Sequence, residues 1–309
     1  SVDYSADVPI GAGILRQLAD VYRKVRNTSR YLLGNLHDFN PASDAIAVAD
    51  LPLLDRWMLQ RTAEVMDEIT EAFESYEFFR FFQLLQNFCV TDLSNFYLDI
   101  AKDRLYVSAP TDQRRRSCQT VMALIIERLA GFIAPVLCHM AEDIWQNLPY
   151  PVQETSVFQR GWPTIPSDWR NDTLSAPVQQ LRDLRAAVNK VLEDCRGRQE
   201  LGASLEAAIR IDARSPELQA ALSWLNDNGD PDVDGLRDWL LVSQLQLGGE
   251  PWAEVLASHE DELALIEVSR ARGTKCERCW HYEGDVGQHP DHPHICGRCV
   301  GVLERRTHQ

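Results

Sequence analysis

Apolar side chains recur every three or four residues between Ile14 and Leu36, which is the period of an α-helix. The apolar face of this predicted helix consists of Ile14, Leu18, Val21, Val25, Leu32 and Leu36, and Thr28 fills its one gap. The opposite face is basic, because Asp20 is its one acidic residue among five cations: Arg16, Arg23, Lys24, Arg26 and Arg30. The pattern therefore predicts an amphipathic helix with a cationic outer face.

Three further segments repeat this period and predict more long helices. They run from Leu54 to Phe73, from Phe78 to Tyr97 and from Leu124 to Ile144, where Pro135 predicts a kink. Residues 38–49 contain Pro41 and several small or polar residues, which is typical of a loop. Four amphipathic helices joined by loops bury their apolar faces against one another, so we expect an antiparallel helical bundle.

The second half of the chain mixes helical and strand patterns. Helices are predicted over 181–192 and 216–225, and strands over 204–212, 240–247 and 263–268. The segment that precedes them is rich in proline and aromatic residues, as linkers are. We therefore predict a mainly α protein: a helical bundle over 1–148, a linker over 149–176, a small α/β unit over 177–270 and a terminal cysteine-rich hairpin module over 271–309.

Composition narrows the class of protein. Hydrophobic residues make up 45 % and charged residues 25 %, a balance that excludes disordered and fibrous chains. No window approaches the ~18 uninterrupted apolar residues of a membrane span. The chain opens with Ser-Val-Asp-Tyr, without an initiator Met or a signal peptide. We expect a cytoplasmic, monomeric piece of a longer protein, with no membrane partner.

The net charge of −15 is distributed unevenly along the chain. Between Glu193 and Glu262 there are 16 acidic and 5 basic residues, so this segment carries −11 of the total. A uniformly acidic protein repels nucleic acid, whereas this distribution leaves the flanking segments able to present basic faces.

Four cysteines carry the clearest chemical signal. Cys276, Cys279, Cys296 and Cys299 form two Cys-x-x-Cys pairs with sixteen residues between them. Four thiolates at this spacing suit one tetrahedral Zn²⁺, and the absence of an open coordination position makes the predicted site structural. Two disulfides are the alternative, which a reducing compartment disfavours. Four histidines of the same loop offer a replacement ligand: His281, His289, His292 and His294.

No group of residues predicts a catalytic site. The neighbouring carboxylates Glu142 and Asp143 fit a solvated helix face, and His139 fits an apolar one. Basic and aromatic residues instead surround the zinc ligands. Cations beside an aromatic ring such as Trp280 are what a single-stranded nucleic acid loop requires, whereas the alternative is that Trp280 packs against its own hairpin.

Segments spread over the whole chain, in order, resemble class I isoleucine–tRNA ligases. Three segments resemble the anticodon-binding bundle of that family: Tyr22–Phe39, Asp50–Trp57 and Phe96–Tyr106. A fourth, Ser156–Pro163, is similar to the linker that closes the bundle. Lys275–Tyr282 with Ile295–Cys299 resembles the C-terminal zinc module of the bacterial-type enzymes. Ligases for valine or leucine share the bundle, so the zinc module favours isoleucine.

The resemblance implies the C-terminal part of an ATP-dependent isoleucine–tRNA ligase, which recognises and positions the anticodon arm of tRNA-Ile. The family's His-x-Gly-His and Lys-Met-Ser-Lys-Ser motifs are absent from the sequence, as is its editing insertion. The catalytic and editing domains are therefore expected as the missing N-terminal partners of this segment.

Charge and family position together suggest where RNA binds. The anticodon stem backbone is expected along Arg23, Lys24, Arg26 and Arg30. Asn27 either shares that face or caps a helix–helix contact. An unpaired anticodon base is expected to stack on Trp280, beside Arg278 and His281.

Two other classes of protein compete with this interpretation. A DNA glycosylase carries a zinc finger with the same cysteine spacing, but it begins with Pro-Glu, and this chain begins with Ser-Val-Asp and is more acidic and helical. A zinc-stabilised protein-interaction module retains the metal and leaves the basic first helix unexplained.

Overall fold

The computed structural model describes residues 4, 7 and 10–307, except for the side chains of 306 and 307. The chain divides into two compact units. One unit contains Ser1–Ala101 and Arg115–Asn171, and the other contains Lys102–Arg114 and Asp172–Gln309. We call them the helical unit and the mixed unit.

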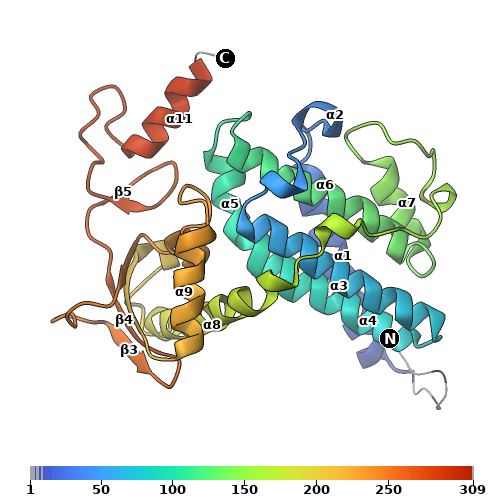
Figure 1. The fold of residues 1–309 in the computed structure, drawn as a ribbon, viewed down its shortest axis with the longest axis horizontal. Coiled ribbons are helices and arrows are strands. Elements are labelled where there is room, and N and C mark those ends of the chain that lie inside the picture. Colours follow the sequence, from blue (N-terminus) through green and yellow to red (C-terminus); the bar gives the residue numbers. More distant parts are fainter. Residues whose placement is uncertain (1–3, 5–6, 8–9, 308–309) are drawn as a thin grey trace. The chain divides into compact units, whose positions relative to one another are not determined.

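The helical unit is built from the long helices that the apolar period predicts (Figure 1). These are α1 (Ala12–Gly34), α3 (Leu53–Glu74), α4 (Phe78–Asn87), α6 (Gln113–Ile133) and α7 (Cys138–Gln146), with the π-helical η2 (Phe88–Tyr97) leading into α5 (Leu98–Val107). The end of α5, from Lys102 onward, and the first two residues of α6 belong to the mixed unit. Short turns complete the helical unit: α2 (Pro41–Asp44), η1 (Val48–Asp50), η3 (Val157–Gln159) and η4 (Ser167–Trp169). The predicted bundle is confirmed.

Three boundaries differ from the sequence-based expectation, each for a local reason. The fourth predicted helix is two helices, because Pro135 disfavours helical backbone at the preceding residue and cannot donate a backbone hydrogen bond. The loop after α1 contains the one-turn α2, whose first turn is capped by the Asn40 side chain accepting from the Ala42 N–H at 3.0 Å. The second half of the helix predicted to end at Tyr97 is the π-helical η2.

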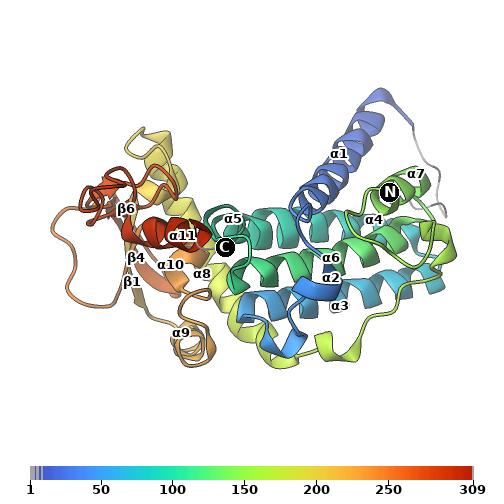
Figure 2. The same ribbon diagram turned by 90° about the horizontal axis from the view of Figure 1, so that it is seen from above.

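The core of the helical unit lies along α3. Leu54, Met58 and Ile69 are completely buried on this helix. Asp55 is buried too, and its carboxylate accepts a hydrogen bond from the Tyr97 hydroxyl at 2.6 Å, which offsets the cost of removing both groups from water. By contrast, α1 crosses the other long helices steeply (Figure 2), and only its second half is buried in this unit.

The turn after α1 is held by two arginines of α6. Arg115 donates two hydrogen bonds to the Asp38 carboxylate, at 2.6 and 2.9 Å, and Gln119 donates a third at 2.8 Å. Arg116 donates to the Asp38 carbonyl at 2.9 Å, and Gln119 also donates to the Asn35 carbonyl at 2.8 Å. These arginines are therefore structural ties within the unit.

The mixed unit contains a four-stranded sheet covered by helices. The strands are β1 (Ala207–Ala213), β2 (Gln244–Leu247), β3 (Ala257–Glu260) and β4 (Ala264–Arg270). The helices and turns are η5 (Asp172–Leu174), α8 (Ser175–Gly197), η6 (Ser204–Glu206), α9 (Pro216–Asn228) and α10 (Leu236–Leu240). The predicted small α/β unit is confirmed.

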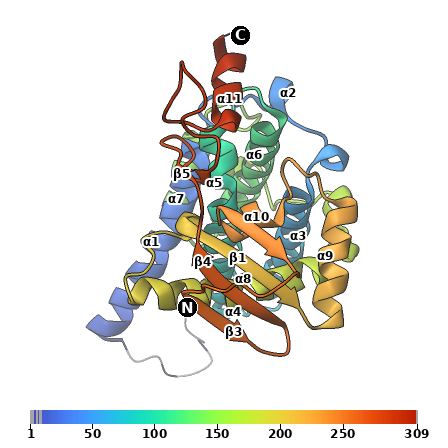
Figure 3. The same cartoon turned by 90° about the vertical axis from the view of Figure 1, so that its left-hand side faces the viewer.

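The strand order is β2-β1-β4-β3, with β1 parallel to β2 and antiparallel to β4. Ile209 therefore pairs with Leu245 on one side and Val268 on the other. Helices α8 and α9 pack against each other and against the sheet (Figure 3). One predicted strand is shorter than expected, because Leu240 ends α10 and Leu241 adopts a left-handed backbone with φ of 56°.

The last elements form a small hairpin module within the mixed unit. Strands β5 (Thr274–Lys275) and β6 (Tyr282–Glu283) pair antiparallel, and α11 (Gly297–Thr307) follows the second cysteine pair. Across the described residues, no helix is both long and apolar enough to cross a membrane.

Replacing Asp38 with Asn tests the tie at the end of α1. Burial alone raises the pKa of Asp38, but the hydrogen bonds from Arg115 and Gln119 and the charges of Arg115 and Arg116 lower it from 3.8 to about 2. We expect Asp38→Asn to lower the free energy of unfolding at neutral pH by about 2 kcal/mol, because each pKa unit corresponds to about 1.4 kcal/mol.

The pH dependence has a definite sign. Because the pKa is lower in the folded state, the ionised carboxylate stabilises the fold above about pH 4, and this contribution disappears as the pH falls towards about 2. Urea unfolding followed by circular dichroism should therefore show the two proteins converging over that range. Asp67→Asn is the control, since its pair with Arg170 at 2.6 Å is solvent-exposed. A constant gap down to pH 2 would contradict the assignment.

Candidate metal centre and nucleic-acid interface

The four cysteines predicted as zinc ligands converge on one point. Their sulfur atoms all lie within 4.8 Å of one another, and all four residues are buried. The first pair follows β5, and the second pair begins at the start of α11, so the two knuckles come from opposite ends of the hairpin. Among the described residues, this group of potential metal ligands contains cysteines alone.

The sulfur separations distinguish a metal site from disulfides. The Sγ atoms of Cys276 and Cys299 are 3.8 Å apart, and those of Cys279 and Cys296 are 3.7 Å apart. Zinc–sulfur bonds of about 2.3 Å directed to the corners of a tetrahedron place the sulfurs about 3.8 Å apart. A disulfide needs about 2.05 Å. The four residues therefore fit a zinc ion, and all four cysteines are free.

The backbone also joins the two knuckles. The Cys296 N–H donates to the Cys276 sulfur at 3.4 Å, so the second knuckle contacts a ligand of the first. Bound zinc would be held by the four thiolates and would cross-link the two knuckles. It leaves no open position for a substrate, so its contribution here is rigidity.

Trp280 follows the first knuckle and is presented to solvent. Its backbone has a φ of 68°, a left-handed conformation that is unusual for a bulky residue, and its N–H donates to the Cys276 carbonyl at 2.9 Å. The side chain is 61 % exposed. The Lys275 ammonium lies 5.6 Å from the ring centroid, within range of a cation–π interaction.

The two neighbours of Trp280 lie deeper in the module. Arg278 is half-buried, and His281 is 4 % exposed. Burial lowers the pKa of His281, and the positive charge of Arg298 lowers it further, against the opposing effects of Cys279 and Asp103. The His281 ring therefore lies under the knuckle and does not face solvent.

The candidate RNA-binding residues of α1 belong to the helical unit. Arg23, Lys24, Arg26, Asn27 and Arg30 are all exposed. Arg23 forms an ion pair with Asp20, one turn earlier. This arrangement matches the cationic face expected from the sequence, and it leaves Asn27 on the surface.

Sequence reasoning missed the residues that contact the zinc module from the C-terminal half of α5. Arg298 binds the Asp103 carboxylate with both guanidinium nitrogens, at 2.7 and 2.8 Å. Burial raises the pKa of Asp103, but the hydrogen bonds and charge of Arg298, with the charge of Arg114, give a net lowering. Val107 lies in the same buried cluster as the four cysteines. The only sequence signal was that Asp103 falls within a family-like segment.

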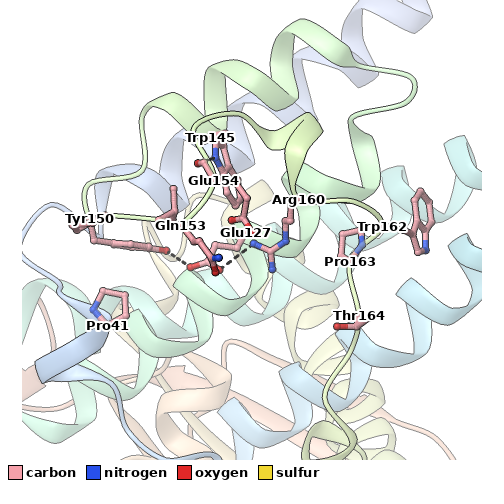
Figure 4. Close-up of a pocket in the computed structure, with 12 residues that line it drawn as sticks. Pro41, Glu127, Trp145, Tyr150, Gln153, Glu154, Arg160, Trp162, Pro163 and Thr164 are labelled. Carbon is pink, nitrogen blue, oxygen red and sulfur yellow. Dashed lines mark hydrogen bonds and ion pairs between the residues drawn. The ribbon is translucent and has the colours of Figure 1, made fainter.

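A cavity of about 500 Å³ opens in the helical unit near α6 and α7 (Figure 4). Two of its charged groups, Glu127 and Arg160, are paired with each other. Glu127 accepts from the Tyr150 hydroxyl at 3.1 Å and pairs with Arg160 at 3.5 Å, while Arg160 lies 5.2 Å from the Trp145 ring centroid. These two groups are therefore already paired within the protein, and the third charged residue of the lining is Glu154.

Replacing Cys276 with Ser tests the metal centre. We expect the variant to lose its zinc and the ordered structure of the hairpin, because the metal supplies most of the folding free energy of so small a module. The helical unit should keep its circular dichroism signal. Metal analysis and hydrogen exchange measure both effects, and Cys138→Ser, at an exposed cysteine, is the matched control. One tightly held zinc in Cys276→Ser would contradict the four-thiolate site.

Comparison with known proteins agrees with this geometry. Residues 55–211 match the family model described as the anticodon-binding domain of tRNA ligase. Residues 273–301 match the zinc finger found in FPG and IleRS. The finger model and the buried sulfur cluster together support one structural Zn²⁺.

Two relatives of high identity are named isoleucine–tRNA ligase. The chain is 98 % identical over 309 residues to an isoleucine–tRNA ligase of Parasynechococcus marenigrum strain WH8102, which covers all of this chain and 32 % of that protein. It is 77 % identical over 306 residues to the isoleucine–tRNA ligase of Synechococcus sp. strain CC9311. That match covers 99 % of this chain and 32 % of the relative. The chain thus spans about a third of the length of these relatives.

The match over residues 55–211 includes just over half of the 309 residues, and it begins in α3 and ends in β1. Because this match covers more than half of the chain, and the helical bundle agrees with it, the chain belongs to the family of anticodon-binding domains of tRNA ligases.

Proposed function

We propose that this chain is the tRNA-binding C-terminal region of an isoleucine–tRNA ligase, and that it recognises and positions the anticodon arm of tRNA-Ile. The observation that carries the proposal is an exposed tryptophan on a four-thiol centre, in a chain of the anticodon-binding family. The relatives named isoleucine–tRNA ligase support the choice of amino acid.

Trp280 supplies the base contact in this proposal. A flat ring that is 61 % exposed can stack on an unpaired base, and stacking is worth about 1–3 kcal/mol per base. Arg278 and Lys275 add positive charge beside it. His281 is buried, so its part is to support the knuckle from beneath.

The basic face of α1 supplies the phosphate contacts. Arg23, Lys24, Arg26 and Arg30 are exposed along one helix, and Asn27 shares that exposed surface. Such contacts position the RNA without reading its sequence, which leaves specificity to the base contacts. The acidic segment 193–262 repels phosphate and so favours these basic surfaces.

The remaining two-thirds of the enzyme completes the proposed activity. Its N-terminal catalytic domain would join isoleucine to tRNA-Ile with ATP, and its editing domain would hydrolyse misacylated tRNA, while this region would hold the anticodon arm. The boundaries 1–148, 149–176, 177–270 and 271–309 remain our proposed division of the chain. We place the whole enzyme in the cytoplasm as a monomer, where reduced cysteines remain available to zinc.

Duplex DNA binding is the second candidate, because the zinc finger model is shared with FPG. A duplex-binding finger needs a free cation for the groove. Arg298, between the last two cysteines, is instead paired with Asp103 at 2.7 Å. This observation favours RNA over duplex DNA as the ligand, and the binding experiment described next includes duplex DNA as a separate ligand.

Replacing Trp280 with Ala should weaken binding to tRNA-Ile by roughly tenfold or more, because the stacking surface is removed. Trp280→Phe should retain most of the affinity. Filter binding to tRNA-Ile, tRNA-Val and duplex DNA measures the effect, with Phe158→Ala, at an aromatic residue that is 55 % exposed, as the control. Equal affinity of Trp280→Ala for tRNA-Ile, or a preference of the wild-type chain for DNA, would contradict the proposal.

Replacing Arg26 with Ala should weaken binding to all tRNAs alike. One lost phosphate contact lowers the slope of log affinity against log salt by about one. A salt series with tRNA-Ile and tRNA-Val measures this slope. Arg214→Ala removes the same charge from the mixed unit, where Arg214 pairs with Glu260, and should leave the slope unchanged. An unchanged slope for Arg26→Ala would remove this residue from the proposed surface.

A further inference from the structure

We propose that Asp103 and Arg298 form a positioning pair, which seats the zinc module on the segment Lys102–Arg114, from the end of α5 to the start of α6, and so sets the direction in which Trp280 is presented to RNA. This inference rests on the proposed function. All of these residues belong to the mixed unit, so their contacts lie within one compact body.

The pair has the geometry of a fixed joint. Two nitrogens of Arg298 bind two oxygens of one carboxylate, at 2.7 and 2.8 Å, and a bidentate pair defines an angle as well as a distance. Arg114 approaches the same carboxylate at 3.1 Å. The side chains of Asp103 and Arg298 are 15 % and 29 % exposed, so water competes weakly for them.

Two further contacts define the seat. Val107 packs into the cysteine cluster, with Val286 and Ile295 partly buried against it. Arg305 approaches Asp112 at 3.5 Å. The loop between α5 and α6 is itself held, because the Asp112 carboxylate accepts a hydrogen bond from the Ala109 N–H at 2.8 Å. The zinc module therefore rests on a firm surface at three points.

Few bonds separate the Asp103–Arg298 pair from Trp280. Arg298 precedes Cys299 directly, and Cys279 precedes Trp280 directly. Bound zinc would join those two cysteines, so only the metal centre separates the pair from the indole. His281, on the other side of Trp280, is buried close enough to Asp103 and Arg298 for their charges to act on it. Loosening the pair should let the knuckle tilt while zinc stays bound.

The test compares zinc-loaded 309-residue chains. Asp103→Asn removes the charge of the carboxylate, and Asp103→Glu retains it as the conservative variant. Glu260→Gln is the matched control, because it changes the net charge equally and its pair with Arg214 is solvent-exposed. Three quantities are measured: zinc per chain, hydrogen exchange of residues 276–283, and the Kd for the anticodon stem-loop of tRNA-Ile.

We expect Asp103→Asn to keep one zinc, to exchange faster over 276–283, and to bind the stem-loop about tenfold more weakly, a change of about 1.4 kcal/mol. Asp103→Glu should lie between this variant and the wild type, and Glu260→Gln should match the wild type. Wild-type exchange and affinity in Asp103→Asn would overturn the inference. Loss of zinc would overturn it too, since the pair would then be needed to form the metal centre.

Failure of the proposed function gives a different result. If the wild-type chain does not bind the stem-loop, anticodon recognition by this region is wrong. The exchange rate over 276–283 then still decides whether Asp103 and Arg298 hold the knuckle. Faster exchange in Asp103→Asn would support the positioning role of the pair without its RNA role. Unchanged exchange would contradict the positioning role and the RNA role alike.

Discussion

The convergence of four thiolates is the constraint on which the end of this protein depends. Residues 271–309 contain too few apolar side chains for a core of their own, and segments of about 40 residues usually need a metal or disulfides to fold. The buried cluster of the module consists of Cys276, Cys279, Cys296 and Cys299 with Val107, the last residue of α5. The ligands are therefore also the core, so metal binding and folding are the same event.

Under the proposed function, rigidity at that centre favours stacking of a base on the exposed ring of Trp280. A stacking residue on a mobile loop would lose conformational entropy on binding, whereas Trp280 is held by its left-handed backbone and its bond to the Cys276 carbonyl. The acidic composition of the chain suits the same purpose. Because residues 193–262 carry −11 of the net charge of −15, that segment repels phosphate, and we propose that the RNA contacts are made by the basic face of α1 and by the knuckle.

Local patterns predicted most of the fold, and non-local contacts escaped prediction. The helices were visible because burial on one face imposes a period of 3.6, and Cys276–Cys299 were visible because metal geometry dictates their spacing. Strand β3, with Ala257 and His259 on one side, lacks the apolar alternation of β1. The pairing of Asp103 with Arg298 joins positions 195 residues apart, and nothing in either local sequence marks it. Whether Trp280 packs inward or faces water also depended on backbone that the sequence pattern does not encode.

We propose that one zinc ion organises the surface that binds the anticodon arm. The decisive measurement adds zinc stepwise to the metal-free, reduced chain and follows binding to tRNA-Ile at each step, with circular dichroism confirming that the helical unit stays folded. We expect affinity to rise with added zinc and to reach its limit at one equivalent per chain. Full affinity in the metal-free chain would contradict it.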